Sequence, residues 1–275
     1  RANRIIGMPE LELERRGDVI RAWYSDRVRI ADNTFRHGRD AILWFSNQAD
    51  IEGNRMSRCR YGLHFMYSDS ARIAGNRMTE NSVGAYLMYS TGLRFERNLL
   101  AHNLRGSAMG LGLKDMDDGV IAGNVLANNQ VGVFIDNSPR SLDTKMRYRR
   151  NAIVYNDVGL ESLSYPPRTY VRKNTFADNQ QQVRLTGGGS APDERTDDWA
   201  QNYWDDYRGY DADGDGWGET PYRARHLFGR IQEQHPKLRL FAHSPSIDAI
   251  RLAARAFPVL EPQPWLSDDQ PAMEP

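Results

Sequence analysis

An asparagine that recurs at a nearly constant interval constrains this chain more than any other feature. Each copy follows an apolar residue by three positions, and the copies are Asn33, Asn54, Asn76, Asn98, Asn124, Asn151 and Asn174. Successive intervals are 21, 22, 22, 26, 27 and 23 residues. Self-similarity at such a period is typical of a solenoid, in which each repeat packs only on its neighbours. The longer intervals predict loop insertions near Gly106–Lys114 and Asp136–Met146 that leave the register intact.

Short strands best explain the pattern inside each repeat. Apolar residues alternate with polar ones between Asn, Gly and Ser, and the 3.6-residue period of an amphipathic helix is absent. A leucine-rich repeat would need a Leu-x-x-Leu-x-Leu pattern and a helical segment in every unit. The sequence therefore predicts an all-β fold, a right-handed parallel β-helix with coils of about 22 residues. One interior stack is expected to contain Ile30, Ile51, Ile73, Phe95, Ile121, Tyr148 and Val171.

The repeated asparagines have a structural explanation that requires no ligand. Asparagine tolerates a left-handed backbone, and stacked amides can form a ladder of hydrogen bonds along the solenoid axis. We therefore expect the asparagines to occupy one turn of every coil and to bond to one another.

Three regions differ in composition. We expect coils over residues 1–185, a linker with an aromatic and Asp-rich capping segment over 186–243, and a helix with a Pro-rich tail over 244–275. The helix is predicted over Ser244–Phe257, which opens with Ser-Pro and stops before Pro258. It either packs on the end of the solenoid or docks to a partner. The tail Glu261–Pro275 is expected to be extended or disordered unless a partner orders it, and not to anchor the fold.

The aromatic run Asn202–Tyr207 has two interpretations. Its large apolar side chains could cover the open edge of the last coil, or they could form a surface on which a ligand stacks. End-capping is the favoured interpretation.

Charge and composition argue against several classes of protein. Lys+Arg and Asp+Glu both number 36, so there is no basic excess to neutralise nucleic-acid phosphates. Apolar runs fall far short of the ~20 residues that span a bilayer. The chain opens with Arg1 and shows no leader-like segment, as expected of a mature or trimmed product. Cys59 is the only cysteine, which excludes an internal disulfide framework.

An acidic loop near the C-terminal end is a candidate calcium site. Asp211, Asp213 and Asp215 occupy positions 1, 3 and 5 of the loop and Gly216 follows, as in oxygen-rich Ca²⁺ loops. The complete EF-hand pattern fails, because Tyr222 stands where a bidentate glutamate is required. Calcium binding and a turn held by Asp side chains both remain open.

Strand alternation also predicts a copper-contact surface. In Gly62–Met66, burial of Leu63 and Phe65 turns His64 and Met66 outward. Thioethers beside an imidazole suit soft Cu(I). Partner docking without metal and ordinary packing are the alternatives, because methionine also adapts to protein interfaces. The proposed surface comprises His64, Met66, Tyr86 and Met88, and Met109 and Met116 with His102 at the preceding turn could extend it.

Carbohydrate chemistry is the alternative function. A lyase, epimerase, hydrolase or sugar-binding protein could use the outward cluster Lys114, Asp115, Asp117, Asp118 and Asp136, since glycoside hydrolysis needs two carboxylates across a sugar. Acidic loops flanked by glycines are more often solvated, and no nucleophile–base pair accompanies this one. We therefore do not expect an enzyme. A rigid scaffold that binds no metal is a third possibility.

Several segments resemble the NosD family, the periplasmic β-helical accessory proteins of nitrous oxide reductase maturation. These segments are Tyr61–Ser68, Gly84–Ser90, Gly110–Asp115, Asn202–Trp204 and Asp211–Gly216, and the resemblance extends from Arg1 to about Phe257. The resemblance implies a periplasmic protein of denitrification that works with an ABC-type permease and its ATPase. It also implies a copper chaperone and nitrous oxide reductase as partners in supplying the copper centres of the reductase. Transient binding of copper as Cu(I) is predicted from the thioether and imidazole groups described above. The family has no fixed ligand motif to transfer, so the copper residues above are predicted from strand phase alone.

Overall fold

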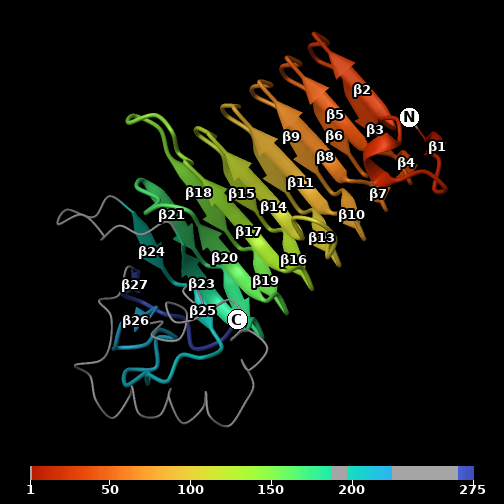
Figure 1. The fold of residues 1–275 in the computed structure, drawn as a ribbon. Helices are drawn as coiled ribbons and strands as arrows, with labels where there is room; N and C mark the ends of the chain where they lie inside the picture. Colours follow the sequence, from red (N-terminus) through yellow and green to blue (C-terminus); the bar gives the residue numbers. More distant parts are fainter. Residues whose placement is uncertain (1, 187–196, 225–265) are drawn as a thin grey trace.

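The computed structural model describes residues 2–186, 197–224 and 266–275. Three parallel sheets wind around one axis and form a β-helix, as predicted (Figure 1). The helical element of the described part is one 3-10 turn, Leu13–Arg15, in the insertion after the first strand. The fold is therefore all-β, and each coil contributes one strand to each sheet.

The three sheets are named A, B and C. Sheet A contains β1 (Arg4–Ile6), β4 (Thr34–Arg36), β7 (Arg55–Ser57), β10 (Arg77–Thr79), β13 (Leu99–Ala101), β16 (Val125–Ala127), β19 (Ala152–Val154), β22 (Thr175–Ala177) and β25 (Tyr203–Trp204). Sheet B contains β2 (Ile20–Trp23), β5 (Asp40–Trp44), β8 (Tyr61–Met66), β11 (Val83–Met88), β14 (Met109–Lys114), β17 (Val131–Asp136), β20 (Val158–Ser162) and β23 (Gln181–Leu185). Sheet C contains β3 (Arg29–Ala31), β6 (Asp50–Glu52), β9 (Arg72–Ala74), β12 (Arg94–Glu96), β15 (Val120–Ala122), β18 (Met146–Arg149), β21 (Thr169–Arg172) and β24 (Asp198–Ala200).

The predicted interior stack is confirmed. Its members pair in register along sheet C, and each is at most 4% exposed: Ile30, Ile51, Ile73, Phe95, Ile121, Tyr148 and Val171. Trp199 on β24 continues the stack by one more coil. Burial of each such side chain contributes roughly 1.5–3 kcal/mol, so this stack is a main source of stability.

The asparagine ladder is also confirmed. The backbone N–H and side-chain NH₂ of Asn54 both donate to Oδ1 of Asn76, over 2.9 and 3.0 Å, and Asn76 repeats this toward Asn98. One expectation is wrong in detail, because the left-handed backbone falls on the residue before each asparagine. Gly53 and Gly75 have φ of 65° and 64° there. Asparagine is needed for its amide, and the preceding residue makes the turn.

A second amide ladder runs parallel to the first and was missed in the sequence. Oδ1 of each member accepts the backbone N–H of the corner residue one coil earlier, and the members are Asn81, Asn103, Asn129, Asn156 and Asn179. Each follows a first-ladder asparagine by five residues, and that spacing could have revealed it. Cys59 occupies the same position in an earlier coil. It is buried, and burial raises the pKa of its thiol to about 11.

The two insertions leave the stacking intact, as predicted. Leu100, Leu126 and Ile153 remain in register across both insertions. The first insertion is shorter than expected, because Met109–Lys114 is strand β14 and the inserted residues precede it. An inserted loop projects from a corner, so it does not disturb the pairing of the strands on either side.

The last coil is closed by the final residues of the chain. Trp204 is 1% exposed and stacks between Phe176 at 4.4 Å and Tyr222 at 4.2 Å, which supports end-capping by the aromatic segment. Strand β27 (Ser267–Asp268) pairs antiparallel with β26 (Tyr222–Arg223), so the expectation that the tail does not anchor the fold is wrong for residues 266–275. The tail is held because Leu266 and Asp268 are completely buried. The predicted helix Ser244–Phe257 lies outside the described residues.

Candidate functional site

The outer face of sheet B places two methionines side by side. Met66 at the end of β8 pairs in register with Met88 at the end of β11. Trp44 precedes them in the same row and Lys114 follows. Both thioethers are half-buried, so they lie at the surface without projecting from it. Strand alternation predicted this placement, and the parallel register brings the two side chains together.

His64 lies on the same face but is more deeply buried than strand phase suggested. It is 9% exposed, because the edge of the Tyr61 ring packs on it at 4.8 Å and Tyr86 lies beside it in the next coil. Its Nδ1 is 3.5 Å from Oδ2 of Asp40, which is long for a hydrogen bond. Neither ring nitrogen has a hydrogen-bond partner within the described residues. Buried polar groups in folded proteins usually have a hydrogen-bond partner, so the two ring nitrogens call for an explanation, and a bound ligand is one.

Met109 and Met116 do not join this cluster. Met109 begins β14 and pairs with Val83, at the opposite end of the strands from Met88. Met116 is 1% exposed and belongs to the apolar core. His102 is exposed at the corner between sheets A and B. The structure therefore places His64, Met66, Tyr86 and Met88 at adjoining positions of one face, and separates Met109, Met116 and His102 from them.

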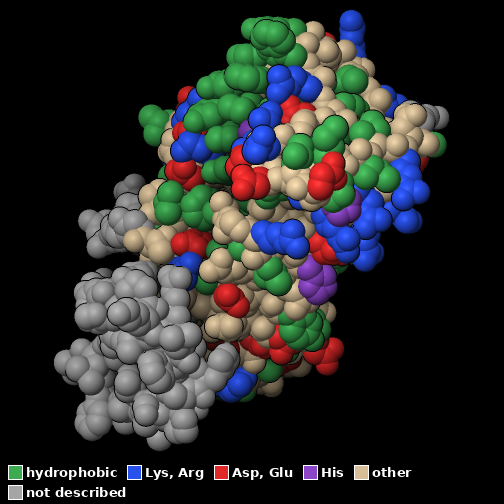
Figure 2. All heavy atoms as spheres, turned by 45° about the vertical axis from the view of Figure 1, so that its right-hand side comes forward, with side chains coloured by type: hydrophobic (Ala, Val, Ile, Leu, Met, Phe, Trp, Pro, Cys, Tyr) green, Lys and Arg blue, Asp and Glu red, His purple; other side chains and the backbone are tan. Residues whose placement is uncertain are grey.

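A stack of aromatic rings borders the methionine row, and the sequence analysis did not find it. The rings lie face to face at 4.9, 5.1 and 4.8 Å, in the order Tyr24, Phe45, Tyr67 and Tyr89. Trp23 and Tyr24 are 62% and 70% exposed. Figure 2 shows the hydrophobic side chains gathered over the first coils. The available signal was an aromatic residue directly after the last residue of each of the first four strands of sheet B, β2, β5, β8 and β11.

The acidic cluster considered for carbohydrate chemistry is occupied by structural contacts. Lys114 pairs with Asp136, which faces it in the next coil. Asp117 is 3% exposed and accepts the Ser141 and Thr144 hydroxyls at 2.7 Å. Burial alone would raise the pKa of Asp117, but these hydrogen bonds lower it below its ordinary value. Asp115 accepts the Asn137 amide and Asp118 accepts the Lys145 backbone N–H at 3.1 Å. These carboxylates hold loops in place.

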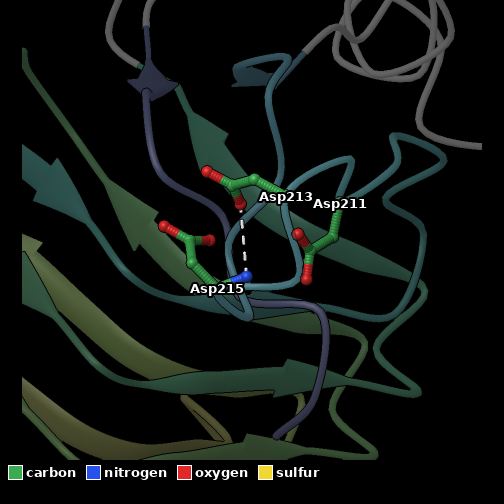
Figure 3. Close-up of side chains that lie close together, drawn as sticks. All are labelled: Asp211, Asp213 and Asp215. Carbon is green, nitrogen blue, oxygen red and sulfur yellow. Dashed lines mark hydrogen bonds between the residues drawn. The ribbon is translucent and has the colours of Figure 1, made fainter.

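The three aspartates of the candidate calcium loop converge, with carboxylate oxygens within 4.8 Å of one another (Figure 3). Asp211 accepts the backbone N–H groups of Gly214 and Gly216 at 2.7 and 2.9 Å. Asp215 accepts the N–H of Trp217 at 2.8 Å. The turn is therefore built by its own side chains, and the carboxylates face a common point.

Fold and surface together define a class of protein, a β-helical binding protein whose rigid coils present thioether, imidazole and aromatic groups. No helix of the described part is long and apolar enough to cross a membrane. The chain belongs to the NosD family, because the family model described as periplasmic copper-binding protein (NosD) matches residues 2–209.

Two curated relatives are each described as a probable ABC transporter binding protein NosD. The protein of Stutzerimonas stutzeri is 37% identical over 105 residues, which cover 37% of this chain and 22% of the relative. The protein of Pseudomonas aeruginosa is 33% identical over 127 residues, or 46% of this chain and 29% of the relative. The chain thus matches about a quarter of each relative's length. Among solved structures, the pentapeptide-repeat protein HetL from Nostoc gives a TM-score of 0.21 at 12% identity over 66% of this chain and 91% of its own, too low for comparison.

Proposed function

We propose that this chain is a periplasmic accessory protein that receives Cu(I) transiently and contributes it to the maturation of nitrous oxide reductase. In this proposal it works with an ABC-type permease and its ATPase, and it takes copper from a copper chaperone. The family description names copper and the periplasm, and the relatives are named as transporter-binding proteins. The chain itself acts by binding and presenting the ion, and not as an enzyme.

One observation supports a direct copper contact above all others. His64 is buried with neither ring nitrogen hydrogen-bonded in the described part, and the adjoining row of the same face contains the Met66 and Met88 thioethers. An imidazole and two thioethers form a soft donor set that selects Cu(I) over hard divalent ions. A site at the surface of a rigid sheet is also open to a donor or acceptor protein, as transfer requires.

The copper contact is tested by anaerobic Cu(I) titration against a competing chelator. We expect the variant with His64→Ala, Met66→Leu and Met88→Leu to bind Cu(I) at least about tenfold more weakly than the wild type, a loss of ~1.4 kcal/mol. Met109→Leu is the matched control, because this half-buried methionine lies at the other end of the strands. X-ray absorption of the bound copper should show sulfur and nitrogen neighbours. Equal affinity in wild type and triple variant would remove this cluster as a ligand site.

We further propose that Asp211, Asp213 and Asp215 bind Ca²⁺. The support is that their carboxylates face one point, while oxygen ligands are those that Ca²⁺ prefers. Calcium should raise the midpoint of thermal unfolding of the wild type, and Mg²⁺ should do so less. The variant with Asp213→Asn and Asp215→Asn should lose the calcium response. An unchanged midpoint together with no heat in calorimetric titration of the wild type would contradict the site.

A further inference from the structure

The corner between sheets A and B collects positive charge on the first coils. One corner position, with a left-handed backbone of 57° to 59° in φ, recurs in four successive coils and holds His37, Arg58, Glu80 and His102. Corner residues of neighbouring coils lie about 4.8 Å apart, the spacing of parallel strands. Arg36, the last residue of β4, comes directly before His37. Figure 2 shows Arg and His side chains gathered on one flank of the molecule.

Arg16 joins this corner from the insertion that follows the first strand. Its guanidinium donates to the backbone oxygens of Pro9 and Leu11, both at 2.9 Å, and to that of Arg58 at 3.4 Å. These contacts fix the side chain in place, and no carboxylate among the described residues forms an ion pair with it. The positive group at this point is therefore preorganised.

The electrostatic effect of the cluster is visible at His37. Burial lowers the pKa of its imidazole, and the charges of Arg36, Arg58, Arg16 and Arg105 lower it further. Four guanidinium groups thus act on one ring. We call Arg16, Arg36, His37, Arg58 and Arg105 the basic corner.

Glu80 is the carboxylate that balances part of this charge. Its Oε2 lies 2.8 Å from Nε of Arg58, and the positive charges of Arg58, Arg36 and Arg105 act together to lower the pKa of Glu80. Within the described residues, Arg36 and Arg105 form no ion pair, and Nε of Arg36 is buried without a hydrogen-bond partner. The whole chain has a formal charge of zero, so the excess of positive charge is confined to this part of the surface.

We propose that the basic corner binds an acidic segment of a partner protein, with the segment's carboxylates seated on the unpaired arginines. The planar guanidinium fork matches a carboxylate through two parallel hydrogen bonds, and Glu80 already shows a carboxylate held at this corner. Cationic groups repeated from coil to coil suit a ligand with several carboxylates along its length. This surface is separate from the copper cluster, which lies on the outer face of sheet B.

The test uses a fluorescently labelled hexaglutamate peptide and fluorescence anisotropy at low and physiological ionic strength. The variant with Arg36→Gln and Arg105→Gln should bind the peptide about tenfold more weakly than the wild type. Arg147→Gln with Arg149→Gln is the matched control, because it removes the same charge from exposed positions of sheet C. Glu80→Gln should bind the peptide about threefold more tightly, since it frees Arg58. Binding should weaken as salt is added.

Each contrary result overturns the proposal. If the control variant lost as much affinity, peptide binding would depend on the net charge of the protein and not on this corner. If Glu80→Gln bound the peptide as the wild type does, the basic corner would not be the binding site. Sedimentation with phosphatidylglycerol vesicles, in the absence of peptide binding, would identify an anionic lipid as the ligand. Full displacement of the peptide by millimolar inorganic phosphate would indicate a site for a small oxyanion. Circular dichroism of each variant confirms that the comparison is between folded proteins.

Discussion

The Asp40 carboxylate lies beneath the face that presents His64 and is 1% exposed. Arg60 donates to it from Nε at 3.0 Å and from a terminal nitrogen, and His64 lies next to it. Burial alone would raise the pKa of Asp40, but the contacts with His64 and Arg60 lower it below its ordinary value. The charged carboxylate is thus the form that the folded chain favours.

This pairing predicts how stability depends on pH. Because the pKa of Asp40 is lower in the folded chain than in the unfolded one, its contribution is present above the unfolded value of about 3.9 and is lost as the pH falls through the folded value. Asp40→Asn should lower the free energy of unfolding by roughly 1.5–3 kcal/mol at pH 7, and the difference should shrink as the pH falls below the unfolded value. Urea unfolding over this pH range checks it, with the exposed Asp143→Asn as control. A difference that stays constant with pH would contradict the assignment.

For single residues, the sequence predicted the direction of a side chain better than it predicted which residues surround that side chain. Alternation along β8 correctly turned His64 and Met66 outward, because the two faces of a strand alternate. The depth of His64 depends on Tyr61 and on Asp40 from the previous coil, and no local pattern specifies them. Met116 follows the end of β14, so strand phase could not show that its side chain turns into the core.

Among the elements, β27 supplies the end of the asparagine ladder. Oδ2 of Asp268 accepts the backbone and side-chain N–H groups of Asn202 at 3.0 and 2.9 Å, and the indole N–H of Trp204 at 3.1 Å. A carboxylate therefore takes the place that the next asparagine would hold in a further coil. The partners are 66 residues apart in the chain, which is why composition alone did not predict that the tail anchors the fold.

Asp268→Ala should destabilise the last coil, since it leaves buried donors of Asn202 and Trp204 without an acceptor. We expect a loss of about 3 kcal/mol in the free energy of unfolding, because each unsatisfied buried donor costs ~1–3 kcal/mol. Denaturant unfolding followed by tryptophan fluorescence measures it. Ser267→Ala, at a half-buried residue of the same strand whose hydroxyl donates to Asp269 near the surface, should change stability by less than about 0.5 kcal/mol. Equal effects of the two substitutions would show that the carboxylate does not cap the ladder.

For the molecule as a whole, periodicity predicted the fold because every coil of a solenoid repeats the same arrangement of strands and turns. The asparagine spacing gave the coils, and the apolar residue three positions earlier gave the interior stack from Ile30 to Val171. The copper cluster and the basic corner are different, since each combines side chains from several coils. Only the register between coils shows that Met66 meets Met88, or that Glu80 meets Arg58.

The stack of Tyr24, Phe45, Tyr67 and Tyr89 gives the molecule optical properties of its own. Nearly parallel rings held about 5 Å apart form an array of neighbouring chromophores in a fixed arrangement, which a disordered chain lacks. Their transitions should add a distinct band to the near-ultraviolet circular dichroism spectrum, and exposed Trp23 and Trp44 provide fluorescence at the border of the same array. Because Met66 and Met88 adjoin these rings, the array is a built-in reporter of events on that face, read without attaching a dye.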